Sequence, residues 1–237
     1  MEWSATGQGF KVMAIHDIIM SAAGGTPITL SYVTSATASA ASITIPATAQ
    51  VGDIVILADR DSNNTTANTY PATIPTGFTQ AISANAISLA TYFYRVLISY
   101  KVLVSGDPGA SITGMPNTYN WARKVLLVFR PSRAISNVTI GSVVSTMLDG
   151  NPAAQTITAS SGALPLIVYT HFTSNINTNI VTPSFSPAQD GFAQILNGAN
   201  PQSQSRYKIY NSSPANTTVD LGSNNGHGIN GFYMSVS

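Results

Sequence analysis

The sequence of 237 residues contains no cysteine. Disulfide frameworks, zinc–thiolate sites and cysteine nucleophiles are therefore excluded, and any chemistry must come from other side chains. Charged residues are also scarce, at 8% of the chain, and the formal net charge is +1. Because the lysines and arginines are scattered along the chain and form no basic stripe, we expect no nucleic-acid partner, since phosphate binding depends on clustered positive charge.

Long apolar runs and phosphate-binding motifs are missing as well. No stretch of about 18 apolar residues occurs, so we expect no helix that spans a membrane. Neither of the glycine-rich loops that hold nucleotide phosphates is present. The three histidines are His16, His171 and His227, and no G-x-S-x-G motif accompanies them. We therefore expect no catalytic residue and a protein that is not an enzyme.

Strand-forming residues dominate what is present. Runs rich in Val, Ile, Thr, Tyr and Phe, broken by Gly, Pro, Asn and Ser, predict an all-β protein. Residues 53–57 and 125–129 are almost wholly apolar, as in central strands that are covered on both faces. The sequence predicts a single domain over residues 28–237, a two-sheet antiparallel β-sandwich of the jelly-roll type.

Only the N-terminal region carries a helical pattern. Four apolar residues recur at helical spacing: Val12, Ile15, Ile18 and Ile19. Gly24 and Gly25 follow as a stop signal. Because a helix of about 12 residues is marginal by itself, we expect residues 1–27 to form an assembly arm. It packs either on its own domain or, through the four apolar residues, on a neighbouring subunit.

The stretch VGDIVILADRDSNN, residues 51–64, holds three of the nine acidic residues. Asp53 precedes the apolar run, where we expect its carboxylate to accept hydrogen bonds from backbone NH groups. Asp59, Asp61 and Asn63 follow with the D-x-D-x-N spacing of a calcium loop, although the Gly and Glu that an EF-hand needs further on are missing. One interpretation is a calcium site, and the other is a solvated polar loop without a cofactor.

Two segments of the chain resemble each other. Residues 42–62 and 155–174 both run from a short strand through a small polar turn with glycine to a buried apolar strand and a polar exit. Either two halves of the protein repeat one unit, or two similar hairpins arose separately. The sequence leaves both explanations open.

Five motifs occur in an order that resembles the β-sandwich virion proteins of tailed bacteriophages. They are GDIVILADRD (52–61), PTGFT (75–79), SYKVLVSGDPGASITG (99–114), ARKVLLVFRPS (122–132) and SSGALPLIVY (160–169). In the similar proteins a Gly-Asp begins a buried strand, a Pro-x-Gly-aromatic-Thr turn follows, and a later strand ends in an Arg-bearing turn. Phe78 stands where tryptophan is common. The resemblance covers about half of the chain, from residue 52 to 169, and carries over no catalytic residue.

The resemblance implies a structural component of a virion rather than an enzyme. We expect a tail or fibre protein that assembles through its arm with other virion proteins and with copies of itself. A capsid decoration or head-fibre protein is the first alternative. The second is a carbohydrate-binding or carbohydrate-cleaving module that recognises a host surface glycan through residues 59–70 and 175–190.

Overall fold

A computed structural model describes residues 26–63, 73–82, 87–89, 92–115, 123–147, 153–159, 164–174, 183–197, 200–221 and 226–237. These residues form sixteen strands and no helix, so the prediction of an all-β protein is confirmed. Within the described ranges there is consequently no helix long and apolar enough to cross a membrane.

The strands divide evenly between the two halves of the chain. The first half contains β1 (Leu30–Ala38), β2 (Ile43–Thr44), β3 (Ile54–Asn63), β4 (Thr79–Ile82), β5 (Ile87–Leu89), β6 (Tyr92–Val102), β7 (Ser111–Ile112) and β8 (Arg123–Pro131). The second half contains β9 (Val138–Met147), β10 (Gln155–Ile157), β11 (Leu166–Ser174), β12 (Ser184–Ser186), β13 (Gly191–Asn197), β14 (Asn200–Tyr210), β15 (Thr217–Asp220) and β16 (Gly226–Val236).

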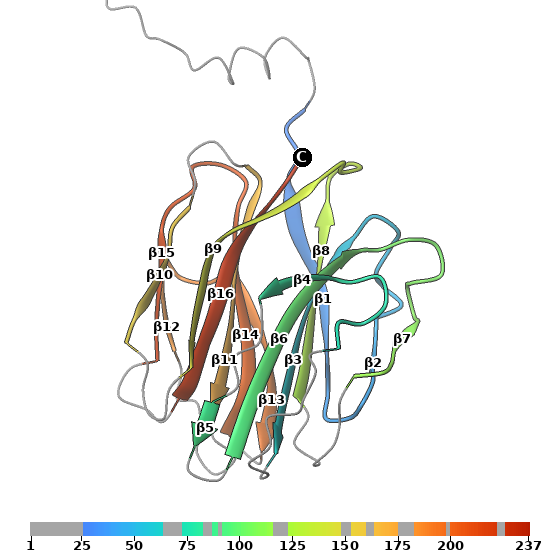
Figure 1. Cartoon of the computed structure of the whole chain (residues 1–237). Coiled ribbons are helices and arrows are strands. Elements are labelled where there is room, and N and C mark those ends of the chain that lie inside the picture. Colours follow the sequence, from blue (N-terminus) through green and yellow to red (C-terminus); the bar gives the residue numbers. More distant parts are fainter. Residues whose placement is uncertain are drawn as a thin grey trace, which may run out of the picture.

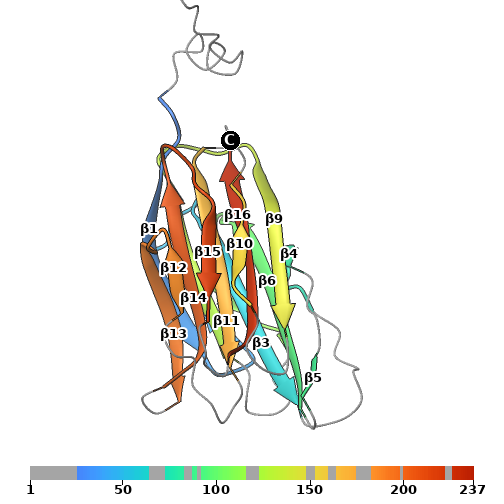
Figure 2. The same cartoon turned by 90° about the vertical axis from the view of Figure 1, so that its left-hand side faces the viewer.

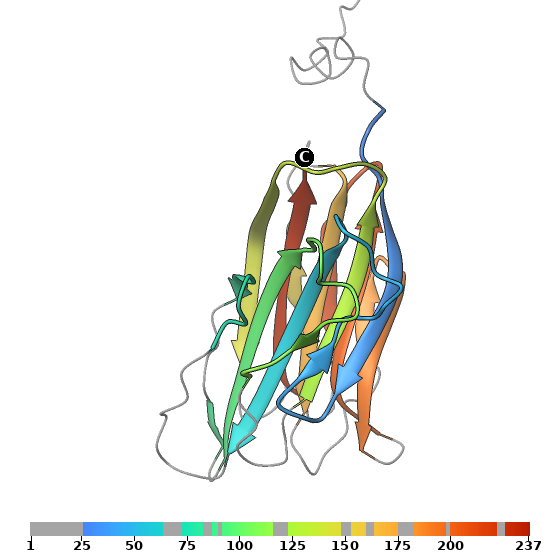
Figure 3. The same cartoon turned by 90° about the vertical axis from the view of Figure 1, so that its right-hand side faces the viewer.

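Two main antiparallel sheets face each other (Figure 1). The first sheet has the order β1-β8-β3-β6-β4, with β5 also paired to β6, and the second has the order β13-β14-β11-β16-β9. Figure 3 shows the first sheet from its outer side, and Figure 2 shows the second. The sheets are thus filled one after the other along the chain. The jelly-roll part of the prediction is not confirmed, because the two Greek keys of a jelly roll distribute successive strands over both sheets.

The two sheets repeat one strand order. Read from β9, the second sheet runs β9-β16-β11-β14-β13, which matches β1-β8-β3-β6-β4 strand for strand. The smaller sheets match as well, because β2 pairs with β7 and β10 pairs with β15. The similar segments 42–62 and 155–174 supply β2 with β3 and β10 with β11, and therefore occupy equivalent places. This arrangement supports the interpretation that two halves repeat one unit.

The registers of the central strands agree too. Tyr100 of β6 lies opposite Ile56 of β3, and Tyr207 of β14 lies opposite Tyr169 of β11. Each tyrosine begins a Tyr-Lys-aliphatic triplet, residues 100–102 and 207–209. The sequence likeness and the pairing therefore coincide at the same position of the two sheets.

Each half is closed by an equivalent backbone hydrogen bond between the residue before its first strand and the residue after its last strand. The NH group of Ser132, directly after β8, donates to the carbonyl of Thr29, directly before β1, at 2.8 Å. In the second half the NH group of Ser237 donates to the carbonyl of Asn137 at 3.1 Å. Each half therefore begins and ends at the same end of the molecule, where Figure 1 also shows the C-terminus.

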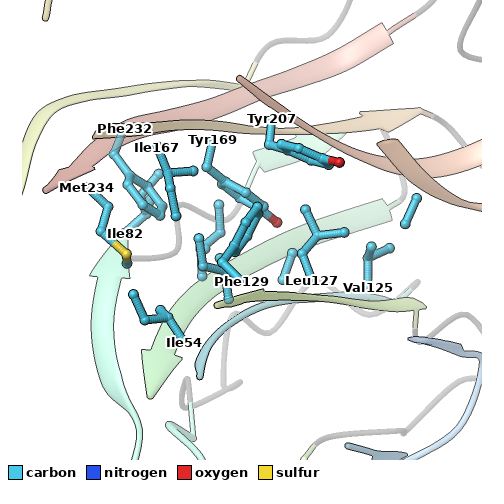
Figure 4. Close-up of a cluster of buried hydrophobic side chains, with 14 of the residues drawn as sticks. Ile54, Ile82, Val125, Leu127, Phe129, Ile167, Tyr169, Tyr207, Phe232 and Met234 are labelled. Atoms are coloured by element: carbon cyan, nitrogen blue, oxygen red, sulfur yellow. The ribbon is translucent and has the colours of Figure 1, made fainter. Parts of the chain in front are cut away.

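The main core lies between the two sheets (Figure 4). Ile54, Leu127 and Phe129 of the first sheet meet Tyr169 and Phe232 of the second. Each sheet also covers a smaller apolar cluster on its outer face, under β2 and β7 in the first half and under β10, β12 and β15 in the second. Core on both faces explains why β3 and β8 are apolar at consecutive positions, as the sequence predicted.

Candidate functional site

The acidic end of β3 is a strand rather than a polar loop. β3 continues to Asn63 in partnership with β6, and Asp59 and Asp61 are both buried. The prediction of a solvated loop is therefore wrong. Cross-strand neighbours explain the difference, because Lys124 of β8 lies opposite Asp59 and Arg95 of β6 lies opposite Asp61. Opposite charges at directly facing positions stabilise strand pairing.

A buried ion pair joins β3 to β8 on the outer face of the first sheet. Lys124 Nζ lies 2.7 Å from Asp59 Oδ1, and the side chains are 0% and 6% exposed. Burial raises the pKa of the Asp59 carboxyl, and the ammonium of Lys124 opposes that shift. Two desolvated charges depend on each other in such a pair, so removing one leaves the other uncompensated.

The calcium interpretation concerns Asp59, Asp61 and Asn63. Asp59 and Asp61 are two residues apart in β3 and therefore share one face, while Asn63 ends the strand. An oxygen of Asp59 is already bonded to the ammonium of Lys124. No group of three or more His, Cys, Asp or Glu side chains that could hold a metal occurs in the described part of the chain. Calcium binding at these residues stays a prediction.

Asp53 belongs to the turn that begins β3. Its Oδ2 accepts a hydrogen bond from the NH group of Gln50 at 2.8 Å, which confirms the expected contact with the local backbone. Arg130, at the end of β8, also donates from Nε to Oδ1 and from Nη2 to Oδ2, both at 2.8 Å. This two-pronged contact fixes the turn to the neighbouring strand and was not foreseen from the sequence.

The proposed docking residues of the arm, Val12, Ile15, Ile18 and Ile19, lie outside the described residues. His16 lies outside them as well.

The second sheet directs a group of polar side chains into the space between the sheets. His171 of β11 lies opposite Ser205 of β14 and Asn230 of β16. Two residues further along β11, Thr173 lies opposite Ser203 of β14. Each of these five residues is 0–1% exposed. From the sequence, His171 is only one of three histidines without a serine motif, and this group of polar residues was not predicted.

A hydrogen-bond relay orients the His171 ring. Tyr169 Oη lies 2.7 Å from Ser205 Oγ, which lies 2.9 Å from His171 Nδ1. Burial, together with the positive charge of Arg60, lowers the pKa of His171 to about 3, so the ring is neutral near pH 7. Burial raises the pKa of Tyr169, which keeps its phenol protonated. If Tyr169 donates to Ser205 and Ser205 donates to Nδ1, both hydroxyl protons of the relay have an acceptor, and the ring proton is on Nε2.

Asn230 is oriented by a second contact. Ser145 Oγ donates to Asn230 Oδ1 at 2.7 Å. Because the oxygen of the amide is taken by Ser145, the amide NH₂ group is the part that points elsewhere.

The Ser205–His171 pair resembles a nucleophile and its base only in residue type. A serine nucleophile must meet its substrate, whereas Ser205 and His171 are both 0% exposed. The relay therefore supports an orienting role for Ser205 rather than nucleophilic catalysis.

Comparison of the chain with protein-family models, with curated proteins and with solved structures finds no match in any of the three. Function must therefore be inferred from the residues and the geometry of the chain itself.

Proposed function

We propose that this protein is a non-enzymatic structural component of a tailed-bacteriophage virion, part of the tail or of a fibre. In this proposal residues 1–27 attach it to neighbouring virion proteins, and the β-sandwich is displayed outward. The supporting observation is where the motifs that resemble virion proteins lie in the fold. Residues 52–61 and 122–132 supply β3 and β8, which are neighbouring central strands.

The other motifs extend the same framework. In PTGFT the NH group of Phe78 donates to the carbonyl of Pro75 at 3.0 Å, and Gly77 has φ 80°, so the motif is a turn that leads into β4. Residues 99–114 supply the end of β6 together with β7. Four motifs thus build adjacent strands of one sheet, in the order β8-β3-β6-β4. The fifth, residues 160–169, leads into the central strand of the second sheet.

The placement of the chain ends favours attachment at one end of the molecule. Thr29 and Ser237 are hydrogen-bonded to Ser132 and Asn137, at the two ends of one short link, and Figure 1 shows the C-terminus at that end. β3 and β11 run from there toward the opposite end (Figure 1). Residues 1–25 precede this end of the described chain. A protein held by those residues would direct the opposite end of the sheets toward a neighbouring subunit or the host surface.

Incorporation into particles tests the proposal. We expect deletion of residues 1–24 to abolish incorporation while the remaining chain keeps its unfolding temperature. Replacing Val12, Ile15, Ile18 and Ile19 by serine should reduce incorporation in the same way. Replacing Ser4 and Thr6 by alanine is the matched control and should leave it unchanged. Normal incorporation of the deletion variant would show that the arm is not the anchor.

Imaging of labelled particles and the copy number per particle distinguish the alternatives. A few copies at the tail tip or in fibres support the proposal. Hundreds of copies over the head would instead favour a capsid decoration. Absence from purified particles would contradict a virion role.

A further inference from the structure

On the inner face of the second sheet, four buried side-chain atoms have no hydrogen-bond partner among the described residues. They are His171 Nε2, Thr173 Oγ1, Ser203 Oγ and Asn230 Nδ2, and we call these four residues the donor cluster. Buried polar atoms are normally paired, and an unpaired one indicates water, an ion or a ligand. Four of them on one sheet face therefore make this face the place to look for a bound species.

Every atom of the donor cluster can present a hydrogen. When Tyr169 donates to Ser205 and Ser205 donates to Nδ1, the imidazole proton of His171 lies on Nε2. Ser145 takes the oxygen of Asn230, which leaves the NH₂ group to donate. Thr173 and Ser203 contribute hydroxyl groups. A set made of NH and OH groups without a carboxylate suits an anion better than a cation.

Gly228 allows two atoms of the donor cluster to come close to one position on β16. A Cβ atom on Gly228 would lie 2.6 Å from Thr173 Oγ1 and 3.5 Å from Asn230 Nδ2. These two atoms therefore approach one common position on β16. His171 is the cross-strand neighbour of Asn230, and Ser203 is that of Thr173, so all four residues border the same region.

The charge of the first sheet adds to this preference. Arg60 of β3 is 0% exposed, and its positive charge acts on His171 across the space between the sheets. A cationic field at the donor cluster stabilises an anion more than it stabilises a neutral water molecule.

The repeated strand order shows that the fold itself does not require polar residues at two of the donor positions, His171 and Asn230. By register, the first-half counterparts of His171, Ser205 and Asn230 are Ala58, Ile98 and Val125. These three residues belong to the apolar main core. His171 and Asn230, two members of the donor cluster, therefore stand where the first half is apolar, whereas the counterpart of Thr173 is the buried Arg60. The apolar first half indicates that the fold alone does not account for His171 and Asn230.

We propose that the donor cluster, facing Arg60, binds one monatomic anion of the halide class between the two sheets. The ligand is small because the residues that border it are all 0–1% exposed, which leaves no opening for a larger oxyanion. The competing occupant is ordered water, which can also accept from NH groups but gains less from the charge of Arg60.

Thermal unfolding of the full chain in chloride and in gluconate, at equal ionic strength, tests the proposal. Gluconate is too large for the site. At a chloride concentration about 100 times the dissociation constant, we expect an unfolding temperature about 5 °C higher than in gluconate. Asn230→Asp keeps the shape and the acceptor for Ser145 but replaces the NH₂ group by a charged oxygen, and it should abolish the difference. Asn137→Asp, the same change at an exposed position, should keep it.

Equal unfolding temperatures of the unaltered protein in the two salts would overturn the proposal. So would an Asn230→Asp variant that retains the full difference, because the stabilising ion would then bind elsewhere. If that variant does not fold, crystals of the unaltered protein grown in bromide decide the matter. An anomalous peak within hydrogen-bond distance of His171 Nε2 and Asn230 Nδ2 is expected, and ordinary water density at that place would contradict the proposal.

Discussion

The two halves of this protein share a strand order but place different chemistry between the sheets. At equivalent positions the first half has Ala58, Ile98 and Val125, and the second has His171, Ser205 and Asn230. On the outer faces, the first half buries the Asp59–Lys124 ion pair, whereas the Lys208–Asp190 pair of the second half is partly exposed. One topology therefore accommodates polar groups in different layers.

The largest effect should come from breaking the buried ion pair. We expect Lys124→Met to lower the free energy of unfolding by about 3–5 kcal/mol, because the Asp59 carboxylate would be left buried without its ammonium. Lys208→Met, which breaks the partly exposed Lys208–Asp190 pair of the second half, should cost less than about 1 kcal/mol. Urea unfolding of both variants measures the difference. Equal small losses would show that the pair in the first half is not energetically distinct.

Moving a polar group from the second half into the first should be nearly as costly. We expect Val125→Asn to destabilise the protein by about 3 kcal/mol, because the amide would face apolar core without the partner that Ser145 gives to Asn230. Val143→Asn, at an exposed valine of β9, is the control and should change stability little. Equal stability of the two variants in urea would refute the contrast between the inner layers.

His171 should make the second half sensitive to acid. The unfolded chain binds a proton at His171 near pH 6.5, whereas the folded chain, whose His171 pKa is about 3, does not. Stability attributable to this residue is therefore present above pH 6.5 and is lost as the pH falls toward 3. Between pH 7 and pH 5 we expect a loss on the order of 2 kcal/mol that His171→Gln does not show. Urea unfolding at both pH values tests this, and parallel losses in the two proteins would count against it.

The smallest effect concerns the turns that lead into the central strands. Gly52 has φ 89° before β3, and the equivalent position before β11 is Pro165. No atom lies within 4 Å of a Cβ added at Gly52, so the new methyl group would meet no steric clash. Gly52→Ala should therefore lower the free energy of unfolding by about 1 kcal/mol, because alanine is held in a left-handed backbone conformation that it disfavours. Val51→Ala in the same turn serves as the control. If the urea midpoint of Gly52→Ala shifts no more than that of Val51→Ala, the backbone of the turn must adjust to accept alanine at position 52.

Much of the framework could be predicted from the sequence. The all-β class and the buried central strands follow from consecutive apolar residues, because only a strand covered on both faces needs them. The bond from Gln50 to Asp53 follows from the position of an aspartate beside a turn. The likeness of residues 42–62 to 155–174 also pointed to strands that the fold places in equivalent positions.

The polar interior could not be predicted in the same way. The sequence predicted that the strand ends before Asp59 and Asp61, because charged residues usually follow a buried apolar run. The strand continues through both residues because Lys124 and Arg95, distant in the sequence, lie opposite them. For His171, the alternation in LIVYTHFTS does place the ring on the same face as Ile167 and Tyr169. The sequence does not say that this face is the inner one, since the opposite face is equally apolar.

Two closing bonds, from Ser132 to Thr29 and from Ser237 to Asn137, bring the first and last described parts of the sandwich to the same end of the molecule. The fold therefore resembles that of a circular chain. The link between the halves, residues 133–136, is short and starts and finishes at the end where residues 29 and 237 also lie. A linker of about six residues, which can span roughly 20 Å, should therefore join residue 237 to residue 29. A circular permutant opened at Ala134 would then form the same two sheets with the order of the halves exchanged.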